Sequence, residues 1–536
     1  MNKRKRKNNC AKNVEKCRKR LYYIGDFFLL EGSDLRDYLK RRPLFLCSLI
    51  GACICVMGYY SKTAVFFAGI CFIIICFVFI YNTVQAPYVV VMILLVLLSV
   101  RLLKTYEKIE SAQKVCGTEL KGRFIVCESP EENDGYYTSV LESAGCDGIE
   151  NGTTIFVFSN ESGFVCGDAL SAVVYADSID ERYKLSNYSE KIYLNGNIEE
   201  ISDVEKDADP VLSVFEDIRG YIRKTLFSGM KYDEAETLSA LVFRDRSYID
   251  DEFYELIKRA GVSHVMVVSG MHLAIIVSLV TRISGKLFYS SGVKAVLIFI
   301  TVLFMTALCG FTKSIIRAGV CYIIYAVSIL TRRDNDSVNT LGGAVTVILI
   351  AEPMTVFSIS FQLSALSTLG IVAAAIPSVR YITERRFLGG RCDGLLGAVA
   401  VTSFAMLFTL PVTSYVFGYV SSVSVATNIL ISFAVTLALG LAAVGLVIYP
   451  FIPVIGKCLL NAAGIASAYI NLVIREFGSL PFAVIKLGKL AFVCSLALLF
   501  SVIWALFACK KRNDMLKLKA VNRKIVKEGG GKFRWR

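Results

Sequence analysis

Long apolar segments recur along the chain and predict an α-helical protein that crosses a membrane many times. A membrane-spanning helix needs about 20 mostly apolar residues, and most of these segments approach or exceed that length. The segment at 339–352 is short enough to be re-entrant or to span only half of the membrane. The twelve candidate spans lie at 43–60, 64–81, 86–103, 262–281, 293–311, 314–331, 339–352, 356–377, 394–412, 425–450, 457–476 and 491–509.

The hydrophilic stretch between two blocks of spans has a different pattern. Short β-branched and aromatic runs alternate with turn residues over 104–210 and predict a compact β-rich domain, either a small barrel or a sandwich. At 211–261 the apolar residues recur at helical spacing, which predicts amphipathic helices at the membrane interface. The remaining parts are a basic N-terminus at 1–42, an N-terminal membrane block at 43–103, a second membrane block at 262–509 and a basic tail at 510–536.

Basic residues at both ends predict that both termini are cytoplasmic in a bacterial cell membrane. Residues 1–42 hold 14 Lys/Arg and 5 Asp/Glu, and residues 510–536 hold 11 and 2. Such segments remain on the inner side, and the first lacks the small-residue cleavage site of a signal peptide. Two inner termini require an even number of spans, which twelve satisfies. The first three spans then place 104–225 outside, and the basic loops at 331–333 and 380–391 fall inside.

The composition excludes a soluble protein, and the charge of the hydrophilic domain argues against simple electrostatic binding of DNA there. Hydrophobic residues make up 55% of the 536 residues, and the formal net charge is +14. Most of that charge lies in the termini, where it orients the protein and attracts it to the membrane surface. The segment 104–225 holds 24 Asp/Glu and 12 Lys/Arg. An acidic surface repels phosphate, so this domain gives no simple electrostatic case for DNA binding.

Four of the 17 cysteines lie in the hydrophilic domain: Cys116, Cys127, Cys146 and Cys166. On an oxidising side of the membrane we expect at least one disulfide among them, and three full pairings are open. The other cysteines are interpreted as small buried hydrophobic residues. Their spacing indicates no metal site, and we expect no cofactor.

The only two histidines, His264 and His272, lie in one apolar segment, with Ser269 and Gly270 between them. Ionisable groups at membrane depth are costly, so they usually face a wet cavity or a protein interior. The two imidazoles therefore indicate a transport path or a site. The alternative is that each is a satisfied interior hydrogen-bonding group that holds helices together.

A second polar segment runs from Gly310 to Arg317 and includes Lys313 and Ser314. Lys313 and Arg317 are four residues apart, so they share one face of a helix. The predicted topology places them near the outer side, where cations are disfavoured, and attraction of a polyanion would explain them. The alternative is that both side chains reach lipid headgroups.

Two further polar segments lie later in the second membrane block. Gln362 and Ser364 belong to a span rich in hydroxyl side chains, which either join helices or line a wet path. Asn428 is the lone amide of a long apolar helix, and its alternative role is a hydrogen bond between helices.

Together these segments resemble the ComEC family of competence proteins. The family signature Gly-x-x-His-x-x-x-x-Ser-Gly-x-His is similar to the segment from Gly261 to His272. Three more family elements are similar, in the same order, to segments at 310–318, 353–364 and 411–428. The hydrophilic domain at 104–210 resembles the OB-like domain of the family more loosely.

The resemblance implies an inner-membrane channel that imports single-stranded DNA during natural competence. Phosphate attraction would then fall to Lys313 and Arg317, and the other polar residues would line the path or hold broken helices. The implied partners are single-stranded DNA, membrane lipid, a DNA receptor and a cytoplasmic uptake ATPase. Many members also carry a metallo-β-lactamase-like domain with a zinc cluster, which this sequence lacks. We therefore expect that this chain is not an enzyme and that a separate nuclease degrades the other strand.

Two other function classes stay open. An intramembrane hydrolase would use Ser269 as nucleophile and His272, three residues later, as base. No acidic residue lies nearby in the sequence to orient that imidazole. A small-anion transporter would predict internal repeats, and none is convincing between the two membrane blocks.

Overall fold

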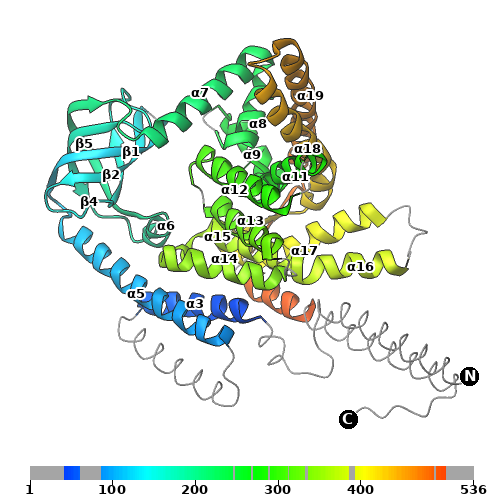
Figure 1. Cartoon of the computed structure of the whole chain (residues 1–536). Helices are drawn as coiled ribbons and strands as arrows, with labels where there is room; N and C mark the ends of the chain where they lie inside the picture. The colour runs from blue at the N-terminus through cyan, green and yellow to red at the C-terminus, as the bar shows by residue number, and fades with distance from the viewer. Residues whose placement is uncertain are drawn as a thin grey trace, which may run out of the picture.

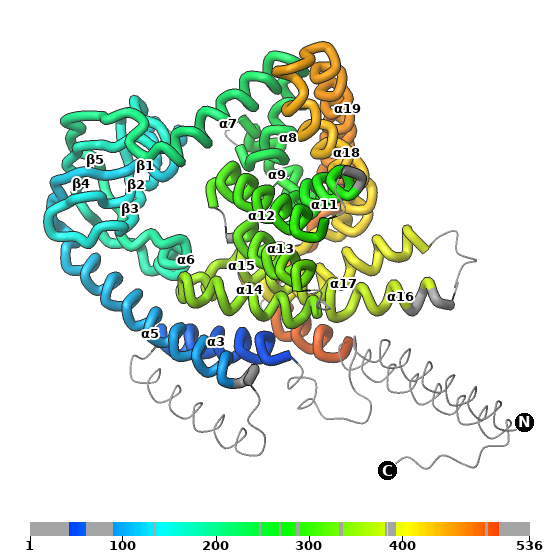
Figure 2. Tube along the Cα trace, in the orientation of Figure 1, coloured from blue at the N-terminus to red at the C-terminus, as the bar shows by residue number. Residues whose placement is uncertain are grey.

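The chain folds into a small β-barrel and a larger helical body, joined by long helices (Figure 1). The computed structural model describes residues 42–60, 86–133, 135–245, 248–266, 270–287, 290–311, 313–331, 336–385, 393–487 and 491–502. Helix α3 (Pro43–Tyr60) packs beside α5 (Ala86–Lys114), which leads to the barrel (Figure 2). From the barrel, α7 (Pro210–Gly229) runs to the helical body, where it contacts α8, α12 and α19.

The hydrophilic domain is a closed five-stranded barrel with the strand order β1-β2-β3-β5-β4. Strands β3 and β5 are parallel, and the other neighbours are antiparallel. Side chains alternate along each strand, so Ile155 and Val157 of β3 are buried inside. The predicted β-rich domain is confirmed. Its elements are β1 (Glu119–Asn133), β2 (Tyr136–Cys146), β3 (Thr154–Ser159), β4 (Ala169–Asp177), α6 (Lys184–Ser189) and β5 (Ile192–Glu205).

The four cysteines of this domain are free thiols, and no disulfide occurs among the described cysteines. The predicted disulfide is therefore not confirmed. The Sγ of Cys166 donates to the backbone oxygen of Cys127 at 3.1 Å, whereas the Sγ of Cys146 donates to the backbone oxygen of Arg123 at 3.2 Å. Burial raises the pKa of Cys127 to about 12 and the pKa values of Cys146 and Cys166 to about 11. Cys116 is half-buried.

Seven described helices are long and apolar enough to cross a membrane, which supports a helical membrane protein. They are α5, α12, α13, α15 with its continuation to Arg380, α17, α18 and α19. Four shorter apolar helices lie at Pro43–Tyr59, Gly270–Gly285, Ser337–Ala351 and Ala491–Val502. The predicted count of twelve spans is not established, and the candidate at 64–81 lies outside the described residues.

The second membrane block consists mainly of helices. The predicted span at 262–281 contains α10 and α11, with residues 267–269 between them outside the described residues, and a 3-10 turn, η1, precedes α15. The bounds are α10 (Ser263–Met266), α11 (Gly270–Leu287), α12 (Ser291–Leu308), α13 (Lys313–Thr331), α14 (Ser337–Ala351), η1 (Pro353–Phe357), α15 (Ile359–Gly370), the π-helical η2 (Ile371–Ala375), α16 (Ile376–Arg385), α17 (Asp393–Val416), β6 (Tyr419–Ser421), α18 (Ser424–Ile448), α19 (Pro453–Gly478) and β7 (Val484–Lys486).

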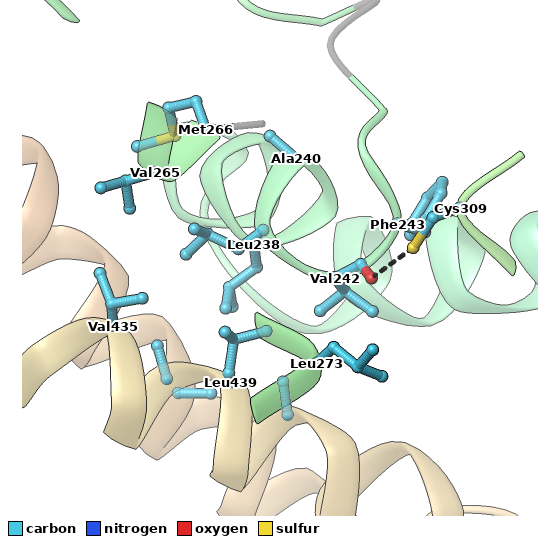
Figure 3. Close-up of a cluster of buried hydrophobic side chains, with 14 of the residues drawn as sticks. Leu238, Ala240, Val242, Phe243, Val265, Met266, Leu273, Cys309, Val435 and Leu439 are labelled. Carbon is cyan, nitrogen blue, oxygen red and sulfur yellow. Dashed lines mark hydrogen bonds between the residues drawn. The ribbon is translucent and has the colours of Figure 1, made fainter. Parts of the chain in front are cut away.

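The apolar core of the helical body surrounds α8 (Tyr232–Phe243), which α9 (Asp251–Ala260) follows. Leu238 of α8 lies close to Leu273 of α11 and Leu439 of α18 (Figure 3). The hydroxyl of Thr237 donates to the side-chain oxygen of Asn471 in α19 at 2.7 Å. From residue 235 onward α8 is entirely buried, so it is a core helix of this body. The interfacial position predicted for 211–261 stays a prediction.

Two polar contacts join the barrel to the turn that precedes α15. Lys191 at the start of β5 lies 3.9 Å from the buried carboxylate of Glu352, and the hydroxyl of Ser358 donates to Glu190 at 3.3 Å. Ser358 is also the N-cap of α15. The barrel is therefore attached next to the helix that carries Gln362 and Ser364.

Candidate functional site

The first contact between the polar segments joins the end of α9 to the start of α18. Gly261 ends α9 in the left-handed conformation, with φ of 73°. Its carbonyl accepts a hydrogen bond from the Ser424 hydroxyl at 3.0 Å, and the Ser421 hydroxyl donates to the carbonyl of Arg259 at 2.8 Å. A Cβ at position 261 would lie 2.5 Å from the Cβ of Ser424. Glycine is therefore needed here both for the backbone turn and for the close approach of α18.

Asn428 connects this contact to the first histidine. Its amide donates to the backbone oxygen of Ser424 at 2.8 Å and to the Ser424 hydroxyl at 3.1 Å. A side-chain hydrogen bond also joins Asn428 to His264. Asn428 is buried, whereas His264 keeps accessible surface. The amide thus fixes an accessible imidazole at the point where α10 meets α18.

His272 lies in the first turn of α11 and is fully buried. It forms a hydrogen bond with the backbone of Val265, so it joins α11 to α10. This position fits the predicted alternative of an interior hydrogen-bonding histidine. Ser269, the residue proposed as a hydrolase nucleophile, lies outside the described residues.

Arg317 joins α13 to α15. It is only 4% exposed, so its side chain lies inside the helical body. Its guanidinium donates to the hydroxyl of Thr368 at 2.9 Å and to the hydroxyl of Ser364. The hydroxyls of Ser364 and Ser314 are 3.2 Å apart. Lys313 begins α13, and the structure does not describe its side chain.

Gly270 places the segment that contains the two histidines next to the guanidinium of Arg317. A Cβ built on Gly270 would lie 3.2 Å from the Cβ of Ala318 and 3.6 Å from Nη2 of Arg317. The first residue of α11 is therefore in contact with α13. Through these contacts the four polar segments, far apart in sequence, meet around the short helix α10 and the N-terminus of α11. We call this region the polar junction: His264, Gly270, His272, Ser314, Arg317, Ser364, Thr368, Ser424 and Asn428.

Two predicted site residues have structural roles next to the polar junction. The Gln362 amide donates to the backbone oxygen of Val356 at 2.8 Å and stabilises the 3-10 turn before α15. Gly310 has φ of 67° in the turn between α12 and α13. Beside that turn, Arg219 of α7 donates to backbone oxygens at the end of α12, at 3.0 and 3.1 Å.

Thr368 and Ser424 belong to the polar junction but were not predicted. Each lies four residues from a predicted residue on the same helix, Thr368 after Ser364 and Ser424 before Asn428. Residues at this spacing share a helix face, so the spacing of four residues was the feature of the sequence that could have predicted these two hydroxyl residues. Within the described residues no group of three or more His, Cys, Asp or Glu side chains could hold a metal ion.

The polar junction lies in the part of the chain that matches a known family. The family model described as Competence protein matches residues 241–512. ComE operon protein 3 of Bacillus subtilis (strain 168) is 22% identical over 328 residues. That match covers 61% of this chain but 41% of the relative, so less than half of the relative's length is represented. No solved structure matches the chain.

Proposed function

The chain belongs to the competence protein family, and on that premise we propose that it is a cytoplasmic-membrane channel that passes single-stranded DNA into the cell. The observation that carries the proposal is the polar junction itself. It places a buried guanidinium among hydroxyls, next to the helix that carries His272, at the meeting point of apolar helices. Polar groups at such depth are costly, and in membrane proteins they mark transport paths.

The chemistry of the polar junction suits a charged and chemically variable strand. A channel for single-stranded DNA has to replace the water around each phosphate with cationic and hydroxyl donors. Arg317, Ser364 and Thr368 supply such donors. The strand must also move, so its bases should be held weakly. Short hydroxyl side chains and Gly270 offer no large flat surface for stacking, and of the two imidazoles that of His272 is fully buried.

A transport role also agrees with the contacts that are described for the polar junction. Among the hydrogen bonds and ion pairs described for the polar junction, none involves a carboxylate. We propose that this chain is not an enzyme, and that a nuclease, a DNA receptor and a cytoplasmic uptake ATPase are separate partners.

The barrel is proposed to be an OB-like domain on the outer side, with both termini in the cytoplasm. OB domains are five-stranded Greek-key barrels, and the closed order β1-β2-β3-β5-β4 supports that assignment. Of the possible disulfides, the one between Cys127 and Cys166 has the best support. Their contact at 3.1 Å brings together residues 39 positions apart, and the two thiols also interact electrostatically.

Reconstitution of the full chain in liposomes tests the proposal. Under an applied membrane potential, a fluorescent single-stranded oligonucleotide should enter, and a duplex of the same length should stay outside. Asn428→Leu, which keeps the size but removes the hydrogen bonds to Ser424 and His264, should reduce entry several-fold. Ser278→Ala, which changes an exposed hydroxyl on α11, is the matched control. Equal entry of duplex and single strand, or no entry through folded protein, would contradict the channel.

A further inference from the structure

Three aromatic rings and two lysines gather where α9 meets the small β6–β7 sheet. Tyr254 and Lys258 are four residues apart on α9, and Nζ of Lys258 lies 4.4 Å from the centre of the Tyr254 ring. Lys258 also interacts electrostatically with Tyr419 of β6, whose ring centre is 6.1 Å from that of Phe417. Tyr419 is paired with Lys486 of β7, and directly opposite residues of an antiparallel sheet share one face. We call these five residues the aromatic-lysine face.

The aromatic-lysine face is accessible and carries positive charge. Phe417 is 48% exposed and Lys486 is exposed, whereas the other three residues are half-buried. One carboxylate, that of Glu255, forms an ion pair with Lys258 at 2.6 Å. Such an ion pair at the surface is weak and is screened by salt. A phosphate group can therefore replace Glu255 as the partner of Lys258.

Hydrogen bonds fix this face next to the polar junction. The Arg259 guanidinium donates to the backbone oxygen of Leu480, shortly before β7, at 3.0 Å. The hydroxyls of Ser421 and Ser424 donate to the carbonyls of Arg259 and Gly261. A sheet of two three-residue strands has little stability of its own, so these bonds to α9 hold it in place. The rings are therefore positioned before any ligand arrives.

We propose that the aromatic-lysine face captures single-stranded DNA, with bases stacked on its rings and phosphates bound by its lysines. The assignment to this strand rests on the proposed channel function. Every base has a flat face, so aromatic rings combined with cations bind a strand without sequence preference. The hydroxyls of the polar junction offer no flat surface, so capture of the strand falls to the aromatic-lysine face and passage to the polar junction.

Aromatic and lysine side chains also gather where a membrane meets water, so a lipid surface is the competing occupant. The position of the face favours the strand. Tyr419 and Ser421 are two residues apart on β6, so both side chains point to the side of the sheet that contacts α9. A strand bound there lies directly beside the segment that leads to Ser424 of the polar junction, a position that a lipid surface does not require.

Oligonucleotide binding to the full chain tests the face. The protein is placed in nanodiscs of zwitterionic lipid, and its affinity for fluorescent oligo(dT) is measured over a series of salt concentrations. Tyr419→Leu should weaken binding about 5- to 150-fold, the loss expected for one stacked base, and leave the salt dependence unchanged. Tyr419→Phe keeps the ring and should keep the affinity. Lys486→Gln should lower the slope of log affinity against log salt by about 0.7.

Two comparisons separate stacking from charge. An abasic oligonucleotide of the same length keeps the phosphates but has no bases, so Tyr419→Leu should not affect its binding, whereas Lys486→Gln should weaken it. Glu255→Gln removes the carboxylate that competes for Lys258, so it should strengthen the binding of both oligonucleotides.

A local measurement excludes binding by the basic termini. Ultraviolet light should cross-link an oligonucleotide that contains 5-iodouracil to a peptide that includes Phe417 and Tyr419. Phe451→Leu and Lys457→Gln are matched controls, because Phe451 is 82% exposed and Lys457 is exposed at the opposite end of the α18–α19 pair. Both should bind like the wild type. Should Tyr419→Leu fail to fold, Phe417→Leu carries the test, because that ring is the more exposed.

The outcomes distinguish the face from the channel. If oligonucleotides enter liposomes, but Tyr419→Leu and Phe417→Leu bind them like the wild type, the face is overturned and the channel stands. If both variants lose binding, but no oligonucleotide enters through the wild type, the face stands and the channel falls. A wild type that binds no oligonucleotide overturns the face. If binding is independent of the rings, but phosphatidylglycerol raises the unfolding temperature of the wild type more than that of Tyr419→Leu, the face contacts lipid and not a strand.

Discussion

Replacement of Gly261 by alanine should destabilise the contact between α9 and α18 strongly. Gly261 has φ of 73°, and its new Cβ would lie 2.5 Å from the Cβ of Ser424 and 2.7 Å from that of Ser421. The left-handed backbone costs an L-residue about 1–2 kcal/mol, and overpacking adds about 1–3 kcal/mol. The sum is about 2–5 kcal/mol of unfolding free energy, part of which would appear as displacement of α18 from His264.

Two other glycines of the chain separate these contributions. Gly418 has φ of 68° and open space around its Cβ position, so Gly418→Ala should show the backbone cost alone. Gly440 lies inside α18 with open space and without a positive φ, so Gly440→Ala should be neutral or slightly stabilising. In Gly261→Ala/Ser424→Gly the closest clash is absent, and stability should return toward that of Gly418→Ala.

A thiol-reactive dye can measure unfolding as an increase above the signal of the exposed thiols Cys53, Cys458 and Cys494, because Cys55 and Cys309 are buried and react only when the helices open. Purified full-length variants in detergent should unfold in the order Gly261→Ala first, Gly418→Ala second, and wild type with Gly440→Ala last. Oligonucleotide entry into liposomes should follow the same order. If Gly261→Ala unfolded at the same temperature as Gly418→Ala, the close approach of α18 would not be a constraint, and the reasoning would be refuted.

Three further predictions concern pH, oxidation and orientation. Burial raises the pKa of Glu236 from its usual 4.5 to about 7, so the protonated carboxyl stabilises the folded protein. This stabilisation is complete below pH 4.5 and is lost as the pH rises through 7. Glu236→Gln should therefore reduce the fall in unfolding temperature over this pH range. Mass spectrometry of unreduced peptides from native membranes should find Cys127 linked to Cys166, and free thiols at both would contradict an oxidising outer side. A reporter active only in the cytoplasm should give signal when fused at Lys511 and none at Asn151; signal at Asn151 would exclude the three-span arrangement.

Local patterns in the sequence predicted much of the architecture. Hydropathy marks a membrane helix without reference to the rest of the chain, so α12, α13, α17, α18 and α19 were all foreseen. The β-runs were likewise found within the barrel strands, because alternation is a local property. Strand order and the enclosure of α8 depend on contacts between distant segments, and the sequence pattern did not predict them.

The site was predicted in its residues but not in its contacts. Arg317 was expected to share one helix face with Lys313, and the structure shows that it is buried and binds Thr368, 51 positions away. The alternative role for Asn428 was a hydrogen bond between helices, and its bond to His264 joins two segments that are far apart in sequence. Gln362 proved to stabilise a turn. Spacing identifies which side chains share a helix face, whereas the partner of that face is decided by packing.

Because the barrel is attached beside α15, movement of the barrel is mechanically coupled to movement of this helix. As long as Lys191 contacts Glu352 and Glu190 contacts Ser358, a pull on the barrel acts on the first turn of the helix that holds Arg317 through Ser364. Thermodynamic reciprocity adds a quantitative constraint. Under the proposed function, if a ligand on the barrel strengthens binding of the DNA strand tenfold, a coupling of about 1.4 kcal/mol, the bound strand must strengthen binding of that ligand by the same factor.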